Sequence, residues 1–393
     1  MTTDPCFSWV EIDLGAIQAN FLLACHLVGT AEKVTPVIKT NGYGLGALAI
    51  AHALRECGAT RFCIARVEEA RLLRQAGIDN ALVMMSGLAF GQEQAVVDLK
   101  LTPFVWRLEE ILALAQCVEK NQSIGIVLKI NTGMGRLGFS PEAILEIMTT
   151  IDRMTGVHVV GVASHLACAD EWERPETGQQ VALLRKVLAQ PVWHNRELRV
   201  SMANSAGILA HPQSHFDWVR PGLMLYGVSP FGATCSAPLV AQKIQPVVTW
   251  RTRIVQIRPL SKGDSLGYNH TFTAQRASRI ALLPVGYGDG YFRSLSNKGQ
   301  VLVHDQRARV VGNVCMDLIA IDITDLVGVK EGDVVTLLGK DETQEISIHE
   351  YATWAGTISY EVLCRFGSRV VRCYVNTHGG VHGEVNGINR LAF

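Results

Sequence analysis

The sequence predicts an α/β protein, with a TIM-like (β/α)8 barrel followed by a mostly-β domain. Up to about residue 240, short β-branched runs alternate with longer stretches whose apolar residues recur at helical spacing. Beyond that point, runs such as "RIALLPVGYG" and "QVLVHDQRARVVG" alternate or are β-branched, and turn residues separate them. We therefore expect a barrel over residues 1–242 and a β-rich domain over residues 243–393.

Eight candidate strands support a closed barrel. They are Val34–Lys39, Arg61–Ala65, Ala81–Met85, Thr102–Trp106, Gly125–Ile130, Val157–His165, Leu198–Asn204 and Phe216–Arg220. Each is followed by a helical or short connecting segment, such as "ALAIAHALREC" or "LEEILALAQCVEK". Ser140 is expected to cap a helix that starts at Pro141. Eight such units in roughly 200–250 residues favour the barrel, and a doubly wound open sheet is the main alternative.

Composition narrows the functional class. The 393 residues are 48% hydrophobic and 18% charged, with 36 basic and 36 acidic side chains, which does not suggest a nucleic-acid or membrane surface. No window reaches the roughly 18 apolar residues of a membrane span, and the start lacks the pattern of a secretion signal. The ten cysteines form no C-x-x-C pair. We expect a cytoplasmic protein with reduced, mostly buried thiols and no metal site.

Polar residues end several of the candidate barrel strands. Lys39 ends the first, His165 the sixth, Asn204 the seventh and Arg220 the eighth. The carboxyl ends of barrel strands meet at one face, where barrel enzymes carry their active sites. We therefore expect these four side chains to converge at the barrel mouth.

The loops after the last two strands begin Ser205-Ala206-Gly207 and Pro221-Gly222-Leu223. Small residues there let backbone N–H groups approach an anion such as a phosphate. Pyridoxal phosphate needs a lysine for its Schiff base, a phosphate site and a partner for its pyridine nitrogen. The pattern therefore indicates this cofactor, with Lys39 as its lysine and Tyr43 brought to the phosphate by the glycine-rich turn. A solvated rim lysine followed by an ordinary turn is the alternative.

Nine motifs then resemble, in order, those of bacterial alanine racemases. They are "VIKTNGYGLG", "KINTGMGRLGFS", "SHLACAD", "ANSAG", "VRPGLMLYG", "SLGYN", "VGYGDGYFRSLSN", "GNVCMDL" and "GTISYEVLC", and they span residues 37 to 364. The resemblance implies a barrel that carries pyridoxal phosphate and a C-terminal β domain. It also implies a head-to-tail homodimer, in which the partner's β domain completes each active site.

The same resemblance implies two catalytic bases. Lys39 would hold the cofactor as a Schiff base and remove the α-proton of the D-isomer. Tyr268, in "SLGYN", would act from the other subunit on the L-isomer. Racemisation needs one such group on each face of a planar carbanion. Tyr268 considered alone would be a packing residue.

Further roles are carried over from the family position by position. Arg220 would face the pyridine nitrogen, and because arginine only donates hydrogen bonds, the ring nitrogen must accept and transamination is disfavoured. His165 would join Arg220 in a hydrogen-bonded chain between tyrosine and cofactor. The other cofactor-binding positions are Tyr43, Asn204, Ser205, Gly222, Leu223 and Tyr360. Arg136 would reach the cofactor's phenolic oxygen and the substrate carboxylate, and the backbone N–H of Met316 would also bind that carboxylate.

Lys129 matches a position that can carry a carbamate in the family, with an unmodified lysine as the alternative.

Four positions depart from the family's usual residues. Asn131 stands where aspartate is usual, Leu45 where histidine is common, Asn269 where glycine follows the tyrosine, and Ser359 where asparagine or proline precedes Tyr360. None of these removes a catalytic group.

The sequence thus predicts a racemase that interconverts L- and D-alanine and supplies D-alanine for peptidoglycan. A serine or broader-specificity racemase is the first alternative, because an apolar pocket separates substrates that differ by one hydroxyl by only about 10²-fold. A non-enzymatic carrier of pyridoxal phosphate would resemble the barrel alone, so the β domain with Tyr268 and Met316 opposes it. A decarboxylase of related fold would call for an acidic partner at the ring nitrogen, which Arg220 opposes.

Overall fold

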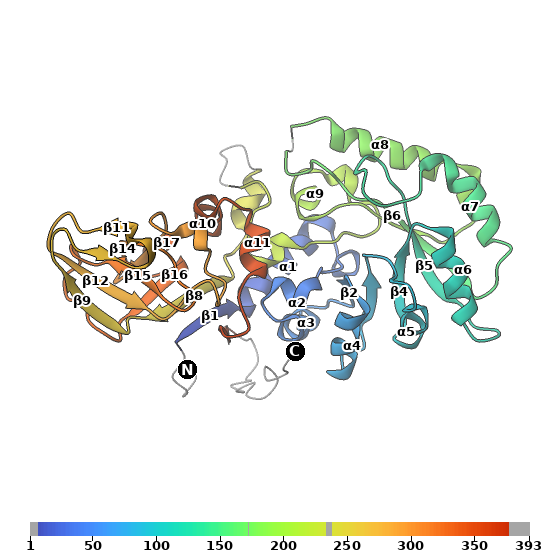
Figure 1. Ribbon diagram of the computed structural model, residues 1–393. Coiled ribbons are helices and arrows are strands. Elements are labelled where there is room, and N and C mark those ends of the chain that lie inside the picture. The colour runs from blue at the N-terminus through green and yellow to red at the C-terminus, as the bar shows by residue number, and fades with distance from the viewer. Residues whose placement is uncertain (1–6, 172, 233–237, 377–393) are drawn as a thin grey trace. The chain divides into compact units, whose positions relative to one another are not determined.

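The computed structural model describes residues 7–171, 173–232 and 238–376 (Figure 1). They divide into two compact units. One contains the described residues between Ile17 and Gln245, and the other contains those up to Ala16 together with those from Pro246 onward. The α/β class is confirmed, since the first unit is built around parallel strands and the second is mostly β.

The first unit alternates strands with helices, as expected. Its strands pair in parallel, in chain order: β2 (Arg61–Ile64), β3 (Ala81–Met84), β4 (Leu101–Val105), β5 (Ile124–Lys129), β6 (Val157–Ala163) and β7 (Arg199–Ser201). Its helices are α1 (Leu14–Val28), α2 (Lys39–Tyr43), α3 (Ala47–Glu56), α4 (Val67–Gln75), α5 (Glu93–Asp98), α6 (Leu108–Cys117), α7 (Ile144–Ile151), α8 (Glu176–Leu188) and α9 (Ser205–Ala210). The helices that follow the strands lie outside them (Figure 1).

The segments at residues 34–39 and 216–220, which were expected to be the first and eighth barrel strands, close the barrel. Neither of them is a regular strand. Val34 bridges Val219, and further single bridges join Val37 to Cys63 and Trp218 to Ser201. The expectation of full strands at residues 34–39 and 216–220 is therefore wrong. Proline at position 36 offers no N–H to a ladder, and Phe216 has a φ of 48°, which interrupts extended backbone.

Ser140 lies where a helix cap was expected, but its side chain makes no capping hydrogen bond. A 3-10 turn over Pro141–Ala143 intervenes before α7 begins at Ile144. Because proline fixes its own φ near −65°, Pro141 starts this turn without help from the serine.

The second unit, within the described residues, is a ten-stranded sheet with two helices. Along the sheet the strands follow the order β18-β1-β8-β16-β13-β14-β15-β12-β9, with β17 beside β16. Their bounds are β1 (Ser8–Asp13), β8 (Val248–Arg253), β9 (Gln256–Leu260), β12 (Ser278–Leu283), β13 (Gln300–Val303), β14 (Gln306–Val310), β15 (Ile319–Asp322), β16 (Val334–Lys340), β17 (Glu345–Ile346) and β18 (Val371–Val375). The hairpin β10 (Ser265–Leu266) and β11 (Phe272–Thr273) and the helices α10 (Ile348–Ala355) and α11 (Ser359–Cys364) complete it.

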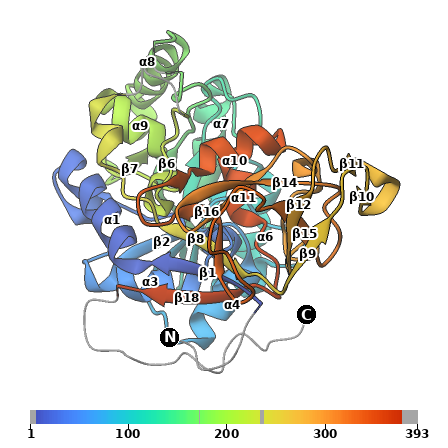
Figure 2. The ribbon, with the colours of Figure 1, turned by 90° about the vertical axis from the view of Figure 1, so that its left-hand side faces the viewer.

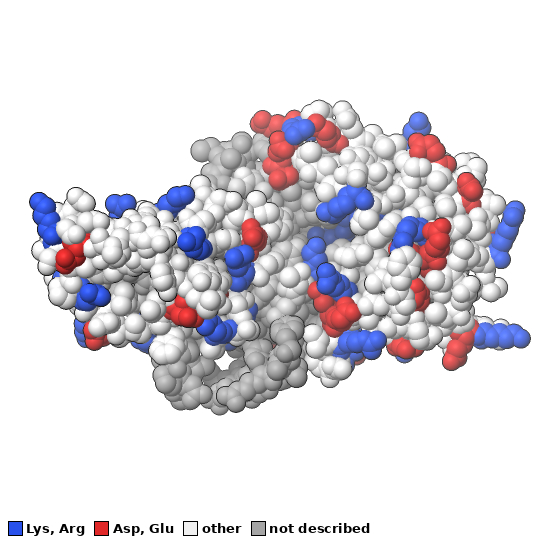
Figure 3. All heavy atoms as spheres, viewed as in Figure 1, with Lys and Arg blue, Asp and Glu red and all other residues white. Residues whose placement is uncertain are grey.

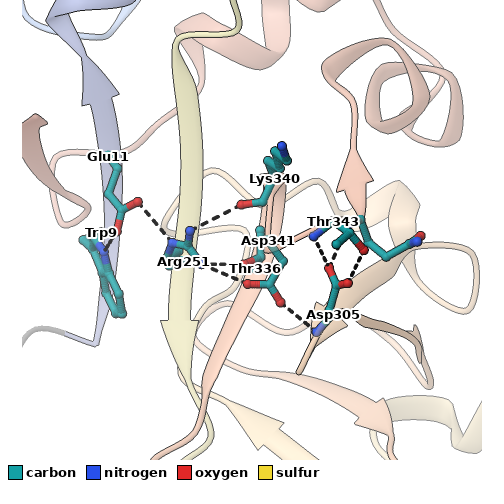
Figure 4. A network of polar contacts seen from close by, with 9 residues as sticks. Trp9, Glu11, Arg251, Asp305, Thr336, Lys340, Asp341 and Thr343 are labelled. Atoms are coloured by element: carbon teal, nitrogen blue, oxygen red, sulfur yellow. Dashed lines mark hydrogen bonds and ion pairs between the residues drawn. The ribbon is translucent and has the colours of Figure 1, made fainter. Parts of the chain in front are cut away.

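Strand β1 was not anticipated from the sequence. It pairs antiparallel with β8 and parallel with β18, so both ends of the described chain meet in one sheet (Figure 2). Arg251 of β8 ties β1 to the rest of the unit. Its guanidinium lies 3.1 Å from the carboxylate of Glu11 and donates to Thr336 at 2.9 Å (Figure 4). This network fixes the N-terminal strand within the second unit.

Fewer of the cysteines are buried than expected. Cys6 and Cys235 lie outside the described residues. Of the described cysteines, Cys25 and Cys63 are buried and Cys364 is exposed, while the remaining five are half-buried. Apolar neighbours along the chain do not determine which face of an element a cysteine occupies, so the expectation of mostly buried thiols is wrong.

The surface carries both signs of charge. Basic and acidic side chains are interspersed on the face shown in Figure 3. Within the described residues, the helices are all too short or too polar to cross a membrane.

Candidate active site

Lys39 does not end a strand but begins α2, which is a left-handed turn. Thr40, Asn41 and Gly42 have φ values of 55°, 52° and 61°, and Tyr43 follows with 55°. Each left-handed residue that carries a Cβ costs roughly 1–2 kcal/mol. Such strain persists only where the surroundings fix it, and it gathers at functional sites. The surroundings therefore impose the left-handed backbone of the turn next to Lys39, which is not an ordinary glycine-rich loop.

Glu69 of α4 holds this turn in place. One of its carboxylate oxygens accepts the N–H of Thr40 at 2.5 Å, and the other accepts the N–H of Ala65 at 2.7 Å. The residue that follows Lys39 is thereby tied to the carboxyl end of β2. Glu69 was not expected from the sequence, although a glutamate at the third position of a helix is a known capping signal.

Positively charged side chains gather at the carboxyl ends of the strands. Lys129, which ends β5, is only 7% exposed. Burial first, and then the charges of Arg220, Arg136 and Lys39, lower the pKa of Lys129 to about 8. The Lys129 ammonium lies 5.9 Å from the centroid of the Trp106 ring. The positive charges of Lys39, Arg136 and Arg220 thus act on Lys129, and the four side chains form an electropositive cluster.

Arg220 is buried, and its environment fixes its orientation. Its guanidinium donates to the hydroxyl of Ser201, to the carbonyl of Ser164 at 2.7 Å and to the carbonyl of Met202 at 3.3 Å. Burial lowers the pKa of Arg220 to about 10, which still leaves it protonated at neutral pH. A buried cation bound mainly by neutral acceptors favours an electron-rich ligand beside it.

His165 follows β6 and contacts Arg220. Its Nδ1 lies 3.4 Å from Nη2 of Arg220. Burial first, and then the charges of Arg220, Lys129, Arg136 and Lys39, hold the pKa of His165 well below its ordinary value. His165 is therefore a neutral imidazole in this site.

The loops expected to hold a phosphate meet at Ser205. Its buried hydroxyl oxygen accepts the N–H of Gly222 at 3.0 Å and the N–H of Met224 at 3.2 Å. These two bonds use both acceptor positions of the hydroxyl and leave its hydrogen for a ligand. Asn204 caps α9 instead, because its side-chain oxygen accepts the N–H of Gly207 at 3.0 Å.

Gly222 and Tyr43 are packed so closely that only glycine fits. A Cβ added at Gly222 would overlap the hydroxyl of Tyr43. The Tyr43 ring stacks on that of Tyr226, with centroids 4.4 Å apart, and the Tyr226 hydroxyl donates to the carbonyl of Val37 at 2.8 Å. The Tyr43 hydroxyl, Gly222 and Ser205 therefore form one small cradle, with Leu223 beginning the 3-10 turn behind it. Tyr226 is a second residue of the site that was not expected from the sequence.

Arg136 lies on an exposed loop that Asn131 organises. The Asn131 side-chain oxygen accepts the N–H groups of Gly133 and Gly135 at 3.1 and 3.0 Å. An aspartate would accept the same two bonds, so the departure at Asn131 preserves the loop and removes one negative charge.

Leu45, the residue that stands where histidine is common in the family, is fully buried.

The remaining predicted residues belong to the second unit. Tyr268 is 71% exposed, and its carbonyl accepts from the side chain of Asn313 at 2.8 Å. Met316 is exposed, and its carbonyl accepts the N–H of Gly288 at 2.9 Å. Tyr360 lies in the first turn of α11, preceded by buried Ser359, whose hydroxyl lies 3.0 Å from Nδ1 of His349. Among the described residues, no three His, Cys, Asp or Glu side chains are grouped to hold a metal.

Half-buried Lys39 lies among positively charged side chains at the carboxyl ends of the strands. Such a site is typical of barrel enzymes that hold an anionic ligand at this face. This chain is of that class. The model of the alanine racemase N-terminal domain matches residues 12–230, and that of the alanine racemase C-terminal domain matches residues 247–374. The chain belongs to the alanine racemase family.

Individual relatives agree over nearly the full length. An alanine racemase of Desulforamulus reducens is 38% identical over 375 residues, which cover 93% of this chain and 98% of that protein. The alanine racemase of E. faecalis superposes with a TM-score of 0.88 at 31% identity, covering 94% of this chain and 98% of that one. The Bartonella henselae alanine racemase with covalently bound pyridoxal phosphate gives 0.85 at 31% identity, covering 94% and 100%.

Proposed function

We propose that this chain binds pyridoxal phosphate and interconverts L- and D-alanine at a site that a second copy of the chain completes. The observation that carries the proposal is the cluster of Lys39, Lys129, Arg136 and Arg220 at the barrel mouth, next to the Ser205 cradle. Family membership supports the reaction.

The residues of the barrel fit this cofactor. The Ser205 hydroxyl, the Tyr43 hydroxyl and the backbone around Gly222 would hold the phosphate, and Lys39 would bind the cofactor's carbonyl carbon covalently. Tyr360 would add a further phosphate contact. When bound, pyridoxal phosphate supplies the electron-withdrawing ring that acidifies the α-proton of an amino acid.

Arg220 would face the cofactor's ring nitrogen and leave it unprotonated. Its contacts to Ser164, Ser201 and Met202 hold the guanidinium rigidly, so it remains a donor throughout the reaction. A ring nitrogen that accepts a hydrogen bond withdraws fewer electrons than a protonated one. This arrangement favours rapid return of the proton to the α-carbon over transamination.

Two groups would move the proton. Lys39 would take it from the D-isomer, and the partner subunit's Tyr268 would take it from the L-isomer on the opposite face. The exposure of Tyr268 in the single chain supports a role toward another copy. Each positioned acid–base group contributes roughly 10²–10⁴-fold to the rate.

Arg136 and the backbone N–H of the partner subunit's Met316 would bind the substrate carboxylate, with Lys129 beside Arg136. Carbamylation of Lys129 would place a negative charge there, and its lowered pKa supports this because the neutral amine is the form that reacts with carbon dioxide. Asn131 adds no charge of its own, so such a carbamate would be a local counter-ion for Arg136.

We further infer a homodimer in the cytoplasm that provides D-alanine for peptidoglycan. Serine racemisation is the second candidate, because an apolar pocket discriminates poorly against one hydroxyl. The β domain disfavours a carrier of pyridoxal phosphate without activity, and Arg220 disfavours a decarboxylase.

The test is to incubate the protein loaded with pyridoxal phosphate with L-alanine, L-serine or L-lysine in deuterated water. Chiral chromatography and mass spectrometry then follow D-isomer formation and α-deuterium incorporation. The proposal predicts fast D-alanine formation with α-deuterium and slower reaction of serine. Bound cofactor without exchange of any amino acid would favour the carrier function.

A further inference from the structure

The turn that carries Tyr268 has a strained backbone. Gly267, Asn269 and His270 have φ values of 74°, 59° and 48°. Asn269 and His270 both carry a Cβ, and each such residue in the left-handed region costs roughly 1–2 kcal/mol. The Tyr268 side chain is 71% exposed, so packing of the ring does not hold the turn. Contacts from elsewhere in the second unit must fix its conformation.

Asn313 supplies one of these contacts. Its side-chain Nδ2 donates to the carbonyl oxygen of Tyr268 at 2.8 Å. This bond acts on the backbone of the catalytic residue itself, whereas the phenol is left to face its ligand. Asn313 itself is half-buried, whereas the bond lies at the exposed surface of the single chain.

Asn297 connects the same two segments a second time. Its Oδ1 accepts the N–H of Gly312 at 2.7 Å, and its Nδ2 donates to the hydroxyl of Thr271 at 3.2 Å. Gly312 precedes Asn313, and Thr271 closes the Tyr268 turn. The neighbouring Ser296 hydroxyl accepts the N–H of Val314 at 3.0 Å.

The loop held in this way continues to Met316. Its Cys315 carbonyl accepts the N–H of Tyr287 at 3.0 Å, and its Met316 carbonyl accepts the N–H of Gly288 at 2.9 Å. The two side-chain amides therefore fix the Tyr268 turn against the segment that presents the N–H of Met316.

We propose that Asn313 and Asn297 are positioning residues that lock the Tyr268 turn to the Met316 loop, so that the base and the carboxylate-binding N–H keep one relative placement. The inference rests on the proposed function, because it takes Tyr268 as the base for the L-isomer. Both asparagines bind backbone groups or a hydroxyl of the protein, so we expect them to act through the geometry of the two segments.

The experiment compares α-deuterium incorporation from L-alanine and from D-alanine by the holoenzyme in deuterated water. Asn313→Asp and Asn313→Ala both remove the donor to Tyr268, the first with nearly unchanged shape and the second without added charge. We expect exchange from L-alanine to fall roughly tenfold or more relative to exchange from D-alanine, because a small displacement of a base is costly. Cofactor absorbance should stay at the parental level.

Thr271→Val keeps the bond from the N–H of Gly312 to Asn297 but removes the hydroxyl that accepts from Nδ2 of Asn297, so it should shift the same ratio in the same direction by less. Asp325→Asn is the matched control, since it breaks an exposed pair with Arg276 in the same unit and should leave the ratio unchanged. Tyr268→Phe is the reference variant. Equal loss of exchange from both isomers, or a parental ratio, in both Asn313 variants would overturn the proposed positioning role of the two asparagines. Equal loss of exchange from both isomers in Tyr268→Phe would overturn the proposed role of Tyr268 as the base, and the positioning role with it.

Discussion

Nη2 of Arg220 lies 3.4 Å from Nδ1 of His165, and the direction of this contact is fixed by chemistry. Guanidinium nitrogens only donate, so Nδ1 must be the acceptor and the imidazole must be neutral with its hydrogen on Nε2. Burial and the positive charges around His165 both lower its pKa, which also favours the neutral ring.

We therefore predict that His165 stays neutral as the pH is lowered through 6.5, the ordinary pKa of histidine. Nitrogen NMR of the histidine rings would show Nδ1 without hydrogen on both sides of that pH, because burial and the neighbouring cations hold the pKa of His165 well below it. A midpoint near 6.5 would show that burial and these cations do not act on the ring as the structure indicates.

Lys129 should make stability depend on pH above neutrality. Its pKa is about 8 in the folded chain against 10.5 for an ordinary lysine. Between these values the unfolded chain binds more protons, so stability rises with pH over this window, by about 3 kcal/mol. Below pH 8 the full cost of the buried charge is present.

Denaturant unfolding in carbon-dioxide-free buffer at pH 7 and pH 10 would measure this effect. Lys129→Gln should be more stable than the parent at pH 7, and the advantage should shrink toward pH 10. Lys298→Gln, at an exposed position, should follow the parental curve. Parallel curves for the parent and Lys129→Gln would contradict the assignment.

Gly222→Ala should weaken cofactor retention, because the added methyl overlaps the hydroxyl of Tyr43. We expect roughly tenfold loss of pyridoxal phosphate affinity, measured by equilibrium dialysis and absorbance. Tyr43→Phe in the Gly222→Ala background should restore part of it, since the clashing oxygen is gone, and the two effects should not add. Gly178→Ala on α8, where a Cβ meets nothing within 4 Å, is the control. Additive losses would show that the two sites do not share a cradle.

Glu69→Gln should loosen the left-handed turn beside Lys39. A glutamine has one acceptor oxygen, so either Thr40 or Ala65 would lose its partner. A buried backbone N–H without a partner costs about 1–3 kcal/mol. These two bonds are at most partly buried, so unfolding measurements should show a loss near the lower end of that range. Glu68→Gln, whose carboxylate accepts an exposed hydrogen bond from Gln92, should be close to neutral. Equal stability of the two variants would show that Glu69 does not hold the turn.

The barrel could be predicted because its signals are local. Apolar periodicity and turn residues located the regular strands β2 to β7 to within a few residues. The closing segments were overestimated, since single bridges at Val37 and Trp218 leave no sequence period to distinguish them from strands. Strand β1 was missed because its partners, β8 and β18, lie more than 200 residues away in sequence.

The cationic residues of the site could be predicted from strand ends and from motifs. The residues that orient them could not. Glu69, Tyr226 and Asn313 act through backbone groups of distant segments. Apart from the helix-capping position of Glu69, such a hydrogen bond to a carbonyl or an N–H leaves no pattern in the sequence. The left-handed backbone at Thr40 and Asn41 was likewise hidden, because neither residue type requires it.

The central claim is that two bases from two copies of the chain act on one substrate, and mixed dimers of Lys39→Ala and Tyr268→Phe test it most directly. Each variant alone should lose racemisation by about 10²-fold or more. Unfolding and refolding the two together should restore about a quarter of the parental rate, because half of the random dimers then contain one intact pair of bases. Refolded mixed dimers with bound cofactor and no recovered D-alanine formation would contradict the shared site.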